Sequence, residues 1–331
     1  MTKTQKRGKT MDTSKSYLSK VVKEMPDSGI KDFFDIANTM EGALSLGVGE
    51  PDFPTPEHVR EAAIASIKRG ETKYTDNRGT VELRAAAAEY LEKFGLHYDR
   101  ENEILITMGA SEGIDLALRA LVDPGDEVLV VEPCYVSYIP CVELCGGIPV
   151  SIPLKAENKF RLTKEELEEK ITDKTKAIVI INPNNPTGAL YPKEILEQIV
   201  ELAREHQLMI FSDEIYDRLV MDGQKHISIA SLAPDLFCIT FSGLSKSHMI
   251  AGFRIGWMVL SGRKDIAKDY IEGLNMLSNM RLCSNVPAQS IVQTALGGYQ
   301  SVETYIQPGG RIYEQREFIY KALNDIPGVS A

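Results

Sequence analysis

Short runs of β-branched and other apolar residues alternate along this chain with longer amphipathic stretches. The apolar runs predict seven strands, at residues 103–107, 127–131, 148–154, 176–181, 208–212, 236–241 and 256–260. Helical patterns lie between or around them, at residues 56–69, 80–94, 111–121, 163–171, 192–206 and 265–277. Continuous apolar strands are typical of a sheet that is covered on both faces. Together the two patterns predict a three-layer α/β/α domain with a seven-stranded, mostly parallel sheet.

The two ends of the chain carry no strong series of strands. Residues 286–296 and 305–324 have helical patterns, and we expect the two ends to form a smaller α/β domain beside the sheet. The expected division is a tail and arm in residues 1–50, a large domain in residues 51–290, and the start of the smaller domain in residues 291–331. Residues 1–10 are basic and polar with no apolar segment behind them, which predicts a disordered tail and no secretory signal.

Composition excludes several classes of function. The 331 residues carry a net charge of −10, which argues against a surface for nucleic acid or for anionic membranes. No run of 18 apolar residues exists, so we expect no spanning helix. The five cysteines form no C-x-x-C pair and the five histidines are scattered, which favours reduced thiols in a cytoplasmic protein and no metal site. For the histidines we expect surface or packing roles.

Unusual residues follow several of the predicted strands, where open α/β sheets bind their ligands. After residues 103–107 the chain runs through Gly109, Ala110 and Ser111 into a helix, whose free N–H groups favour a phosphate. The alternative is that Ser111 simply caps this helix. After residue 181 comes a turn rich in asparagine and proline, in which Asn185 either offers its amide to a ligand or bonds its own backbone.

Two further strand ends carry charge. Asp213 and Tyr216 follow residues 208–212, and a buried acid is costly unless it faces a cation; the alternative is a helix N-cap. Ser242, Ser245 and Lys246 follow the next strand, and Arg254 lies in the apolar run beyond. We expect both cations to be buried against an anionic partner. The alternatives are a snorkelling lysine and a surface salt bridge.

One ligand would satisfy all four strand ends. An aldehyde would take the amine of Lys246, a phosphate would take Arg254, and a protonated pyridine nitrogen would face Asp213. Pyridoxal phosphate carries all three groups, so the sequence predicts a site for this cofactor.

Several motifs in the same order resemble the fold-type I, class I pyridoxal-phosphate aminotransferases. They are Gly49-Glu50-Pro51-Asp52-Phe53, Lys73-Tyr74 ahead of Gly79, Asn184-Asn185-Pro186-Thr187-Gly188, Asp213-Glu214-Ile215-Tyr216, and Ser245-Lys246 with Arg254. The resemblance implies that Lys246 binds the cofactor's aldehyde covalently and that Asp213 keeps its ring nitrogen protonated. It also implies hydrogen bonds from Asn185 and Tyr216 to the ring hydroxyl, and Lys246, Asp213 and Tyr216 as the catalytic group.

The remaining roles also come from the resemblance alone. Arg254, Ser245, Ala110 and Ser111 would hold the phosphate, with Ser242 as a further helper, and Tyr135 would stack on the ring. Tyr74 would reach the phosphate of a neighbouring subunit, which implies a homodimer. Gly49, through its backbone, and Asn185 would contact the substrate.

The activity implied is a ping-pong transfer of an amino group between an L-amino acid and a 2-oxo acid. Residues 281–289 and 297–300 look like bacterial glutamate–pyruvate (alanine) aminotransferases, so alanine with 2-oxoglutarate is the expected pair. The front half resembles members acting on aspartate or aromatic amino acids equally well. The same scaffold also admits a β-lyase or a non-catalytic cofactor-sensing domain, because a fold does not fix its reaction.

One departure from the family concerns the end of the chain. Family members continue for some tens of residues beyond a stretch like residues 325–329, and that part carries the arginine that binds the substrate α-carboxylate. No residue here matches that arginine by motif. We therefore expect an incomplete smaller domain, and a chain that keeps the cofactor site but binds amino acids weakly.

Overall fold

The computed structural model of the chain describes residues 16–25, 33, 35–37, 39–42 and 49–331. The chain divides into two compact units, residues 1–45 and residues 46–331, which are described separately. In the first unit, α1 (Lys20–Glu24) begins after Ser19, whose hydroxyl accepts a hydrogen bond from the backbone of Val22. The disordered tail expected for residues 1–10 lies outside the described residues.

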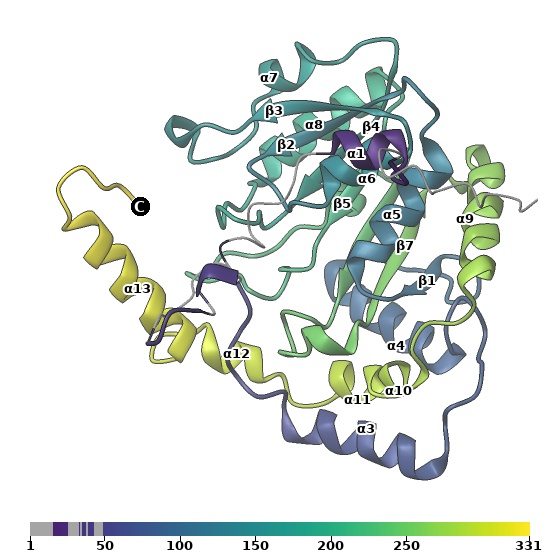
Figure 1. The fold of residues 1–331 in the computed structure, drawn as a ribbon, viewed down its shortest axis with the longest axis vertical. Helices are drawn as coiled ribbons and strands as arrows, with labels where there is room; N and C mark the ends of the chain where they lie inside the picture. Colours follow the sequence, from purple (N-terminus) through teal and green to yellow (C-terminus); the bar gives the residue numbers. More distant parts are fainter. Residues whose placement is uncertain (1–15, 26–32, 34, 38, 43–48) are drawn as a thin grey trace, which may run out of the picture. The chain divides into compact units, whose positions relative to one another are not determined.

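The second unit is built on one seven-stranded sheet with the order β1-β7-β6-β5-β4-β2-β3 (Figure 1). Its strands are β1 (Ile104–Thr107), β2 (Glu127–Glu132), β3 (Ile148–Pro153), β4 (Thr175–Ile181), β5 (Met209–Asp213), β6 (Phe237–Gly243) and β7 (Gly256–Gly262). Neighbouring strands from β6 to β3 are parallel, and β7 is antiparallel to both β1 and β6. The seven predicted strands and the mostly parallel sheet are therefore confirmed.

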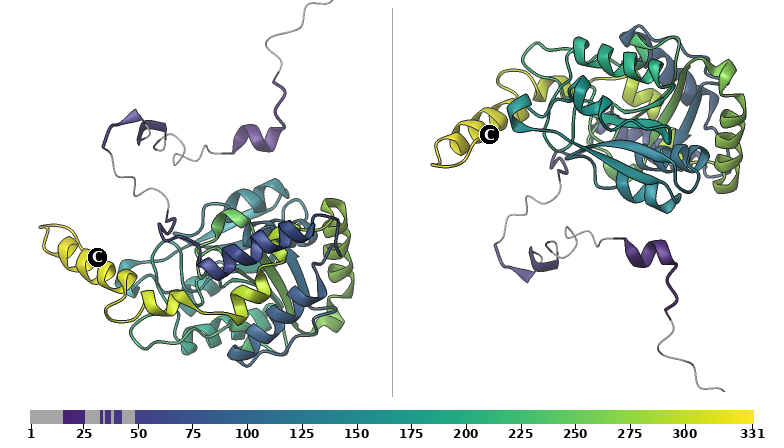
Figure 2. Two further views of the ribbon diagram at one scale, coloured as in Figure 1. Left: turned by 90° about the horizontal axis from the view of Figure 1, so that it is seen from below. Right: turned by 90° about the horizontal axis from the view of Figure 1, so that it is seen from above.

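Helices cover both faces of the sheet (Figures 1 and 2). The helices of this unit are α3 (Glu57–Arg69), α4 (Val81–Leu91), α5 (Ala110–Leu121), α6 (Tyr138–Leu144), α7 (Lys164–Glu168), α8 (Lys193–Glu205), α9 (Lys268–Arg281), α10 (Val286–Gln289), α11 (Val292–Gly297), α12 (Ser301–Tyr305) and α13 (Arg311–Asn324), and α13 extends away from the sheet.

Successive side chains of β4 point to opposite faces of the sheet and so pack against helices on both sides. Ala177, Val179 and Ile181 pack into the core beneath α5 and α6, and Ile178 and Ile180 pack into the core beneath α8. Each is at most 1% exposed. Burying a valine or isoleucine side chain contributes about 1.5–3 kcal/mol, so a strand that is covered on both faces adds strongly to the stability of the fold.

Local signals explain where several helices begin and end. Gly70, with a φ of 76°, ends α3 in the left-handed conformation that glycine adopts without strain. The expected helix at 305–324 is interrupted at Gly309 and Gly310, where a Cβ on Gly310 would lie 2.2 Å from the carbonyl oxygen of Thr304. The expected helix at 163–171 is shorter, since α7 ends at Glu168. Helix α6 was not predicted, because Pro140 lies inside it.

Residues near 50 pack with the carboxyl-terminal helices of the same unit. The ring of Phe53 stacks on Tyr305 with centroids 4.2 Å apart, and Asp52 forms an ion pair with Arg311. These contacts agree with a smaller lobe that draws on both parts of the chain, and the expected domain boundaries stay a prediction. Helix α13 buries none of its residues.

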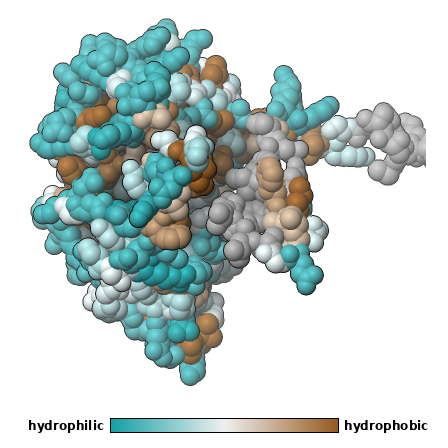
Figure 3. Space-filling model, turned by 90° about the vertical axis from the view of Figure 1, so that its left-hand side faces the viewer, coloured by the Kyte–Doolittle hydropathy of each residue, from teal (hydrophilic) through white to brown (hydrophobic). Residues whose placement is uncertain are grey.

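The face shown in Figure 3 is largely hydrophilic, with separate hydrophobic patches. No helix in the described part of the chain has the length and apolar character that crossing a membrane requires.

Candidate active site at the carboxyl edge of the sheet

The direction of the strands brings five loops to one edge. Because β7 is antiparallel to both neighbours, β1 points the same way as β6 and the other strands. The residues at this edge are in register: Asp213 pairs with Ile181 and Phe241, and Gly256 pairs with Thr107 and Gly243. The loops that follow β1, β2, β4, β5 and β6 therefore meet where β7 begins.

A cavity of about 160 Å³ opens at this edge. It brings together nine of the residues that the sequence singled out. Its lining consists of Ala110, Ser111, Tyr135, Ile181, Asn185, Asp213, Ile215, Tyr216, Ser245, Lys246, Ala251 and Arg254. Gly49, Tyr74 and Ser242 are not part of this lining.

Lys246 lies in the turn after β6, with its side chain half-buried. Its Nζ donates a hydrogen bond of 3.1 Å to the carbonyl of Gly49 and lies 5.9 Å from the ring centroid of Tyr216. Within the described part of the chain it forms no ion pair. Burial lowers the pKa of this amine, and the charge of Glu50 opposes part of that shift. A larger fraction of neutral amine makes Lys246 a better nucleophile and base.

Asp213 ends β5 and is 4% exposed. Its Oδ2 accepts a hydrogen bond of 2.7 Å from the hydroxyl of Tyr138, and its Oδ1 accepts one of 3.0 Å from the backbone of Ile215. None of the described cations pairs with it. Burial raises the pKa of Asp213 to about 6, and the two hydrogen bonds oppose the shift. Such a carboxyl gains from any cation that enters the cavity.

The turn after β5 separates two sets of side chains. Asp213 and Tyr216 face the cavity, whereas the carboxylate of Glu214 accepts hydrogen bonds from Ser212, Ser228 and His226 on the other side. Glu214 is only 4% exposed, and its partners satisfy the buried charge. These bonds hold the turn on the side away from the cavity and keep Asp213 and Tyr216 facing it. Burial raises the pKa of Tyr216 to about 12, so its phenol remains a donor.

Helix α5 offers free backbone donors to the cavity. It begins after Gly109, which has a φ of 81°, and no side chain caps it. Ser111 is not the cap, because its hydroxyl lies 3.2 Å from that of Tyr135. A Cβ on Gly109 would lie 2.3 Å from Nη2 of Arg254, and one on Gly256 would lie 2.8 Å from the backbone nitrogen of Ala110. The glycines thus let a guanidinium approach a helix N-terminus, which suits a phosphate.

The expectation that Arg254 is buried is wrong, and Lys246 is only half-buried. Arg254 lines the cavity but stays exposed, so its guanidinium keeps its hydration. It donates hydrogen bonds to the carbonyls of Ala251 (3.0 Å) and Met108 (3.4 Å) and has no carboxylate partner among the described residues. Its φ of 52° is left-handed, at a cost of about 1–2 kcal/mol for a residue with a Cβ. Strain of this kind gathers at functional sites.

Three predicted residues lie outside the lining of the cavity. Ser242 is buried in β6 and its hydroxyl faces the carbonyl of Glu214, 3.5 Å away, because the strand turns this side chain from the cavity. The structure therefore does not place it as a phosphate ligand. Tyr74 is 83% exposed and lines a different cavity, beside Gln289. Gly49 reaches the site through its carbonyl, which accepts from Lys246.

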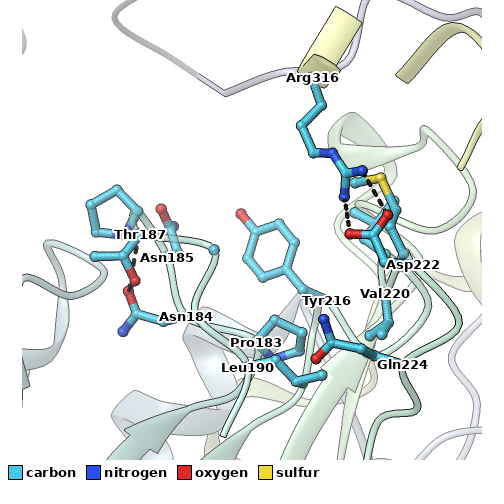
Figure 4. A pocket seen from close by; sticks show the side chains of 14 residues that line it. Pro183, Asn184, Asn185, Thr187, Leu190, Tyr216, Val220, Asp222, Gln224 and Arg316 are labelled. Carbon is cyan, nitrogen blue, oxygen red and sulfur yellow. Dashed lines mark hydrogen bonds and ion pairs between the residues drawn. The ribbon is translucent and has the colours of Figure 1, made fainter. Parts of the chain in front are cut away.

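A second cavity, of about 520 Å³, adjoins the first and shares Asn185 and Tyr216 with it. Figure 4 shows the ring of Tyr216 between the turn of Asn184 and Thr187 on one side and Asp222 with Arg316 on the other. In that turn Asn184 bonds the local backbone, since its Oδ1 accepts from the nitrogen and hydroxyl of Thr187. The side chain of Asn185 forms no hydrogen bond within the described part of the chain and lines both cavities.

Tyr138 is the functional residue that sequence reasoning missed. It lies in α6, is fully buried, and gives Asp213 its only side-chain hydrogen bond in the described structure. Burial and the neighbouring Asp213 raise the pKa of Tyr138 well above its usual value, so it stays a donor. Tyr135 precedes this helix, and no local pattern links Tyr138 to an acid 75 positions away.

The donors at this edge fit pyridoxal phosphate. Free N–H groups and a guanidinium without a carboxylate partner among the described residues suit the phosphate. A buried carboxyl that no described cation pairs with suits a protonated ring nitrogen, and a half-buried amine suits the aldehyde. Tyr135 and Ile181 offer apolar contact for a ring.

Known proteins match this chain over most of its length. The family described as aminotransferase class I and II matches residues 41–331. Glutamate–pyruvate aminotransferase AlaA of Escherichia coli is 48% identical over 290 residues, which are 87% of this chain and 71% of that protein. Alanine aminotransferase of Mycobacterium tuberculosis is 44% identical over 291 residues, 87% of this chain and 68% of that protein.

Solved structures give the same answer. Alanine aminotransferase from Pyrococcus furiosus superposes with a TM-score of 0.90 at 37% identity, covering 95% of this chain and 80% of that one. Aspartate aminotransferase from Thermus thermophilus, solved with maleate, superposes with a TM-score of 0.84 at 33% identity, covering 93% and 80%. The chain therefore belongs to the class I and II aminotransferases, enzymes that depend on pyridoxal phosphate.

Proposed function

We propose that this aminotransferase moves the amino group of L-alanine to 2-oxoglutarate by a ping-pong reaction that releases pyruvate and then glutamate. The observation that carries the proposal is the single cavity in which the half-buried amine of Lys246 meets the buried carboxyl of Asp213. The choice of alanine rests on relatives whose names are glutamate–pyruvate and alanine aminotransferase.

The residues divide the work by their chemistry. Bound pyridoxal phosphate supplies an aldehyde that condenses with amines and a ring that withdraws electrons from the substrate α-carbon. Arg254, Ser245 and the first residues of α5 hold its phosphate, and Tyr135 packs against its ring. The carboxylate of Asp213 holds a positive charge at the ring nitrogen. Nζ of Lys246 takes and returns the proton of the substrate α-carbon, for which its lowered pKa suits it.

Two groups orient the reacting atoms. The amide of Asn185 and the phenol of Tyr216 line both cavities, so each can bond the cofactor's ring oxygen and face an arriving substrate. Gly49 presents backbone to the substrate carboxylate, beside Nζ of Lys246. The expectation that the chain binds amino acids weakly stays a prediction.

We also propose a cytoplasmic homodimer. All five cysteines are free, as in a reducing compartment. Tyr74 is 83% exposed, and the side chains of Met276, Met280 and Leu282 at the end of α9 are 66%, 81% and 45% exposed. A hydrogen bond of 2.9 Å between Asn77 and Asn279 joins these two segments. Exposed apolar side chains gathered in this way favour an interface, from which Tyr74 would reach the partner's phosphate.

Separate half-reactions test the proposal. The loaded protein is mixed with alanine, aspartate or phenylalanine without an acceptor, and the cofactor's absorbance and the released oxo acid are measured. We expect alanine to react fastest, by roughly 10- to 200-fold, and 2-oxoglutarate to restore the spectrum. The Lys246→Ala variant is the control and should not turn over. The same titration measures how tightly alanine binds.

Different results would point to a competing function. If aspartate or phenylalanine reacted faster than alanine, that amino acid would be the preferred substrate. Pyruvate and ammonia formed from a β-substituted amino acid without an acceptor would indicate a lyase. A bound cofactor with no amino-group transfer would indicate a sensing domain.

A further inference from the structure

His248, two residues after Lys246, is 1% exposed and bonded at both ring nitrogens. Its Nε2 lies 2.8 Å from the carbonyl oxygen of Ala295, and its Nδ1 lies 2.9 Å from Oγ of Ser247. A carbonyl only accepts, so Nε2 carries the proton and Nδ1 accepts from the hydroxyl. Burial, then the charge of Arg218, lowers the pKa of His248 to about 4. The ring is therefore neutral at physiological pH.

The carbonyl of Ala295 accepts hydrogen bonds that connect two turns of the site. Nε2 of Gln300 donates to the same oxygen at 2.9 Å, and Oε1 of Gln300 accepts from Arg218. Arg218 lies two residues after Tyr216, in a turn closed by a 2.8 Å bond from the nitrogen of Leu219 to the carbonyl of Tyr216. The turn of Lys246 and the turn of Tyr216 are thus joined through one end of α11.

The turn after Lys246 needs such support. Met249 has a φ of 53°, a left-handed conformation that costs about 1–2 kcal/mol for a residue with a Cβ. Its carbonyl accepts a bond of 2.7 Å from the hydroxyl of Thr55, and His248 just before it is bonded to Ala295. These contacts secure the strained residue from two sides. Without the bond from His248, the turn gains freedom to relax and to carry Lys246 with it.

We propose that His248 is a positioning residue, which sets the amine of Lys246 relative to the phenol of Tyr216 through the shared carbonyl of Ala295. The inference rests on the proposed role of Lys246 and goes beyond it, since no group of His248 lines the cavity. A displacement of about 1 Å at a reacting group can cost up to 10²-fold in rate. A ring that only filled space in the core would have no such effect.

Two substitutions separate hydrogen bonding from packing. His248→Phe keeps a ring but removes the donor, and His248→Gln keeps an N–H near the position of Nε2 but removes the ring. On the apoprotein, we measure how the labelling of Lys246 by trinitrobenzenesulfonate depends on pH, with peptide mapping. On the loaded protein, we measure the pH dependence of the cofactor's absorbance, and kcat and KM with alanine.

For His248→Phe we expect the midpoint of Lys246 labelling to move to higher pH, toward that of exposed lysines. The absorbance midpoint should move as well, and kcat should fall by ~10- to 100-fold with KM less affected. His248→Gln should restore all three toward the wild-type values. The inference is overturned if the Phe variant matches the wild type, or if the two variants lose activity equally without any change in either midpoint.

A further variant tests the inference if the His248→Phe protein does not fold. Gln300→Met breaks the link at Ala295 from the side of Tyr216 and should move the absorbance midpoint. Gln293→Met, an exposed position on α11, the helix that carries Ala295, should not. Equal behaviour of these two variants would also overturn the inference. Failure of the proposed function is distinct, because it appears in the wild type as a cofactor that does not attach to Lys246.

Discussion

The hydroxyl of Tyr138 donates a 2.7 Å hydrogen bond to Oδ2 of Asp213, inside a core where neither residue is more than 4% exposed. This bond is the one side-chain contact that stabilises the charged form of Asp213 in the described structure, and it opposes the rise of the pKa to about 6 that burial produces. Tyr138 thereby helps to keep a charged acid available for a positive ring nitrogen.

Tyr138→Phe should raise the pKa of Asp213 further. The lost bond leaves the carboxylate less stabilised than the carboxyl, and a hydrogen bond to a charged group contributes about 1.5–3 kcal/mol, or roughly 1–2 pKa units. Carboxyl ¹³C NMR of the labelled apoprotein measures the shift. Tyr270→Phe, which removes the hydroxyl of a half-buried tyrosine bonded to the carbonyl of Ala117, is the matched control. An unchanged titration of Asp213 in the Tyr138 variant would contradict the account.

Asp213→Asn should stabilise the apoprotein at pH 7.5 and not at pH 4. The pKa of Asp213 is higher in the fold, about 6, than its ordinary 3.8, so its ionisation destabilises the fold as pH rises through this window. The full effect above pH 6 is about 3 kcal/mol. Urea denaturation at the two pH values measures it.

With saturating pyridoxal phosphate, the wild type should instead be more stable than the Asp213→Asn variant. The wild-type carboxylate then gains a cation, and the amide of the variant does not, so the variant loses cofactor affinity and activity by ~10²-fold or more. A variant that is as stable and as active as the loaded wild type would show that Asp213 faces no cation.

Arg254→Gln should weaken the binding of pyridoxal phosphate but not of pyridoxal. The guanidinium has no carboxylate partner in the described structure, and its loss removes a charge-assisted bond to phosphate, or ~10- to 100-fold in affinity. Fluorescence titration with both compounds measures the difference. Arg263→Gln, an exposed arginine paired with Asp265, is the control. Equal losses for both compounds would place the phosphate elsewhere.

Mixing two inactive variants tests the role of Tyr74 across the interface. A heterodimer of Tyr74→Ala and Lys246→Ala subunits has one site with both residues intact. Random exchange makes half of the dimers mixed, so about one quarter of the wild-type activity should return. Activity is followed while the two homodimers exchange subunits. No recovery, with mixed dimers confirmed by mass spectrometry, would mean that Tyr74 acts within its own subunit or not at all.

The sequence predicts the strands well, because each is an apolar run of ordinary strand length. The direction of β7 could not be predicted. The twelve residues 244–255 between β6 and β7 are as long as a parallel crossover requires, although they return antiparallel. Helix α6 could not be predicted either, because it contains Pro140 and proline usually interrupts helices.

At the site, too, some residues could be predicted from the sequence and others could not. Residues at strand ends were predictable, because the carboxyl edge of the sheet gathers them regardless of detail. Tyr138 and His248 were not, because their bonds reach residues 75 and 47 positions away, which no local pattern encodes. The side of the strand that Ser242 faces and the exposure of Arg254 depend on the same long-range packing.

Reduction with borohydride followed by peptide mapping is the most direct test of the central claim. The wild-type protein should turn yellow with pyridoxal phosphate, and reduction should fix one pyridoxyl phosphate group on Lys246. The Lys246→Ala protein should stay colourless and unmodified. A group fixed on another lysine, or a wild-type protein that takes none, would contradict the account.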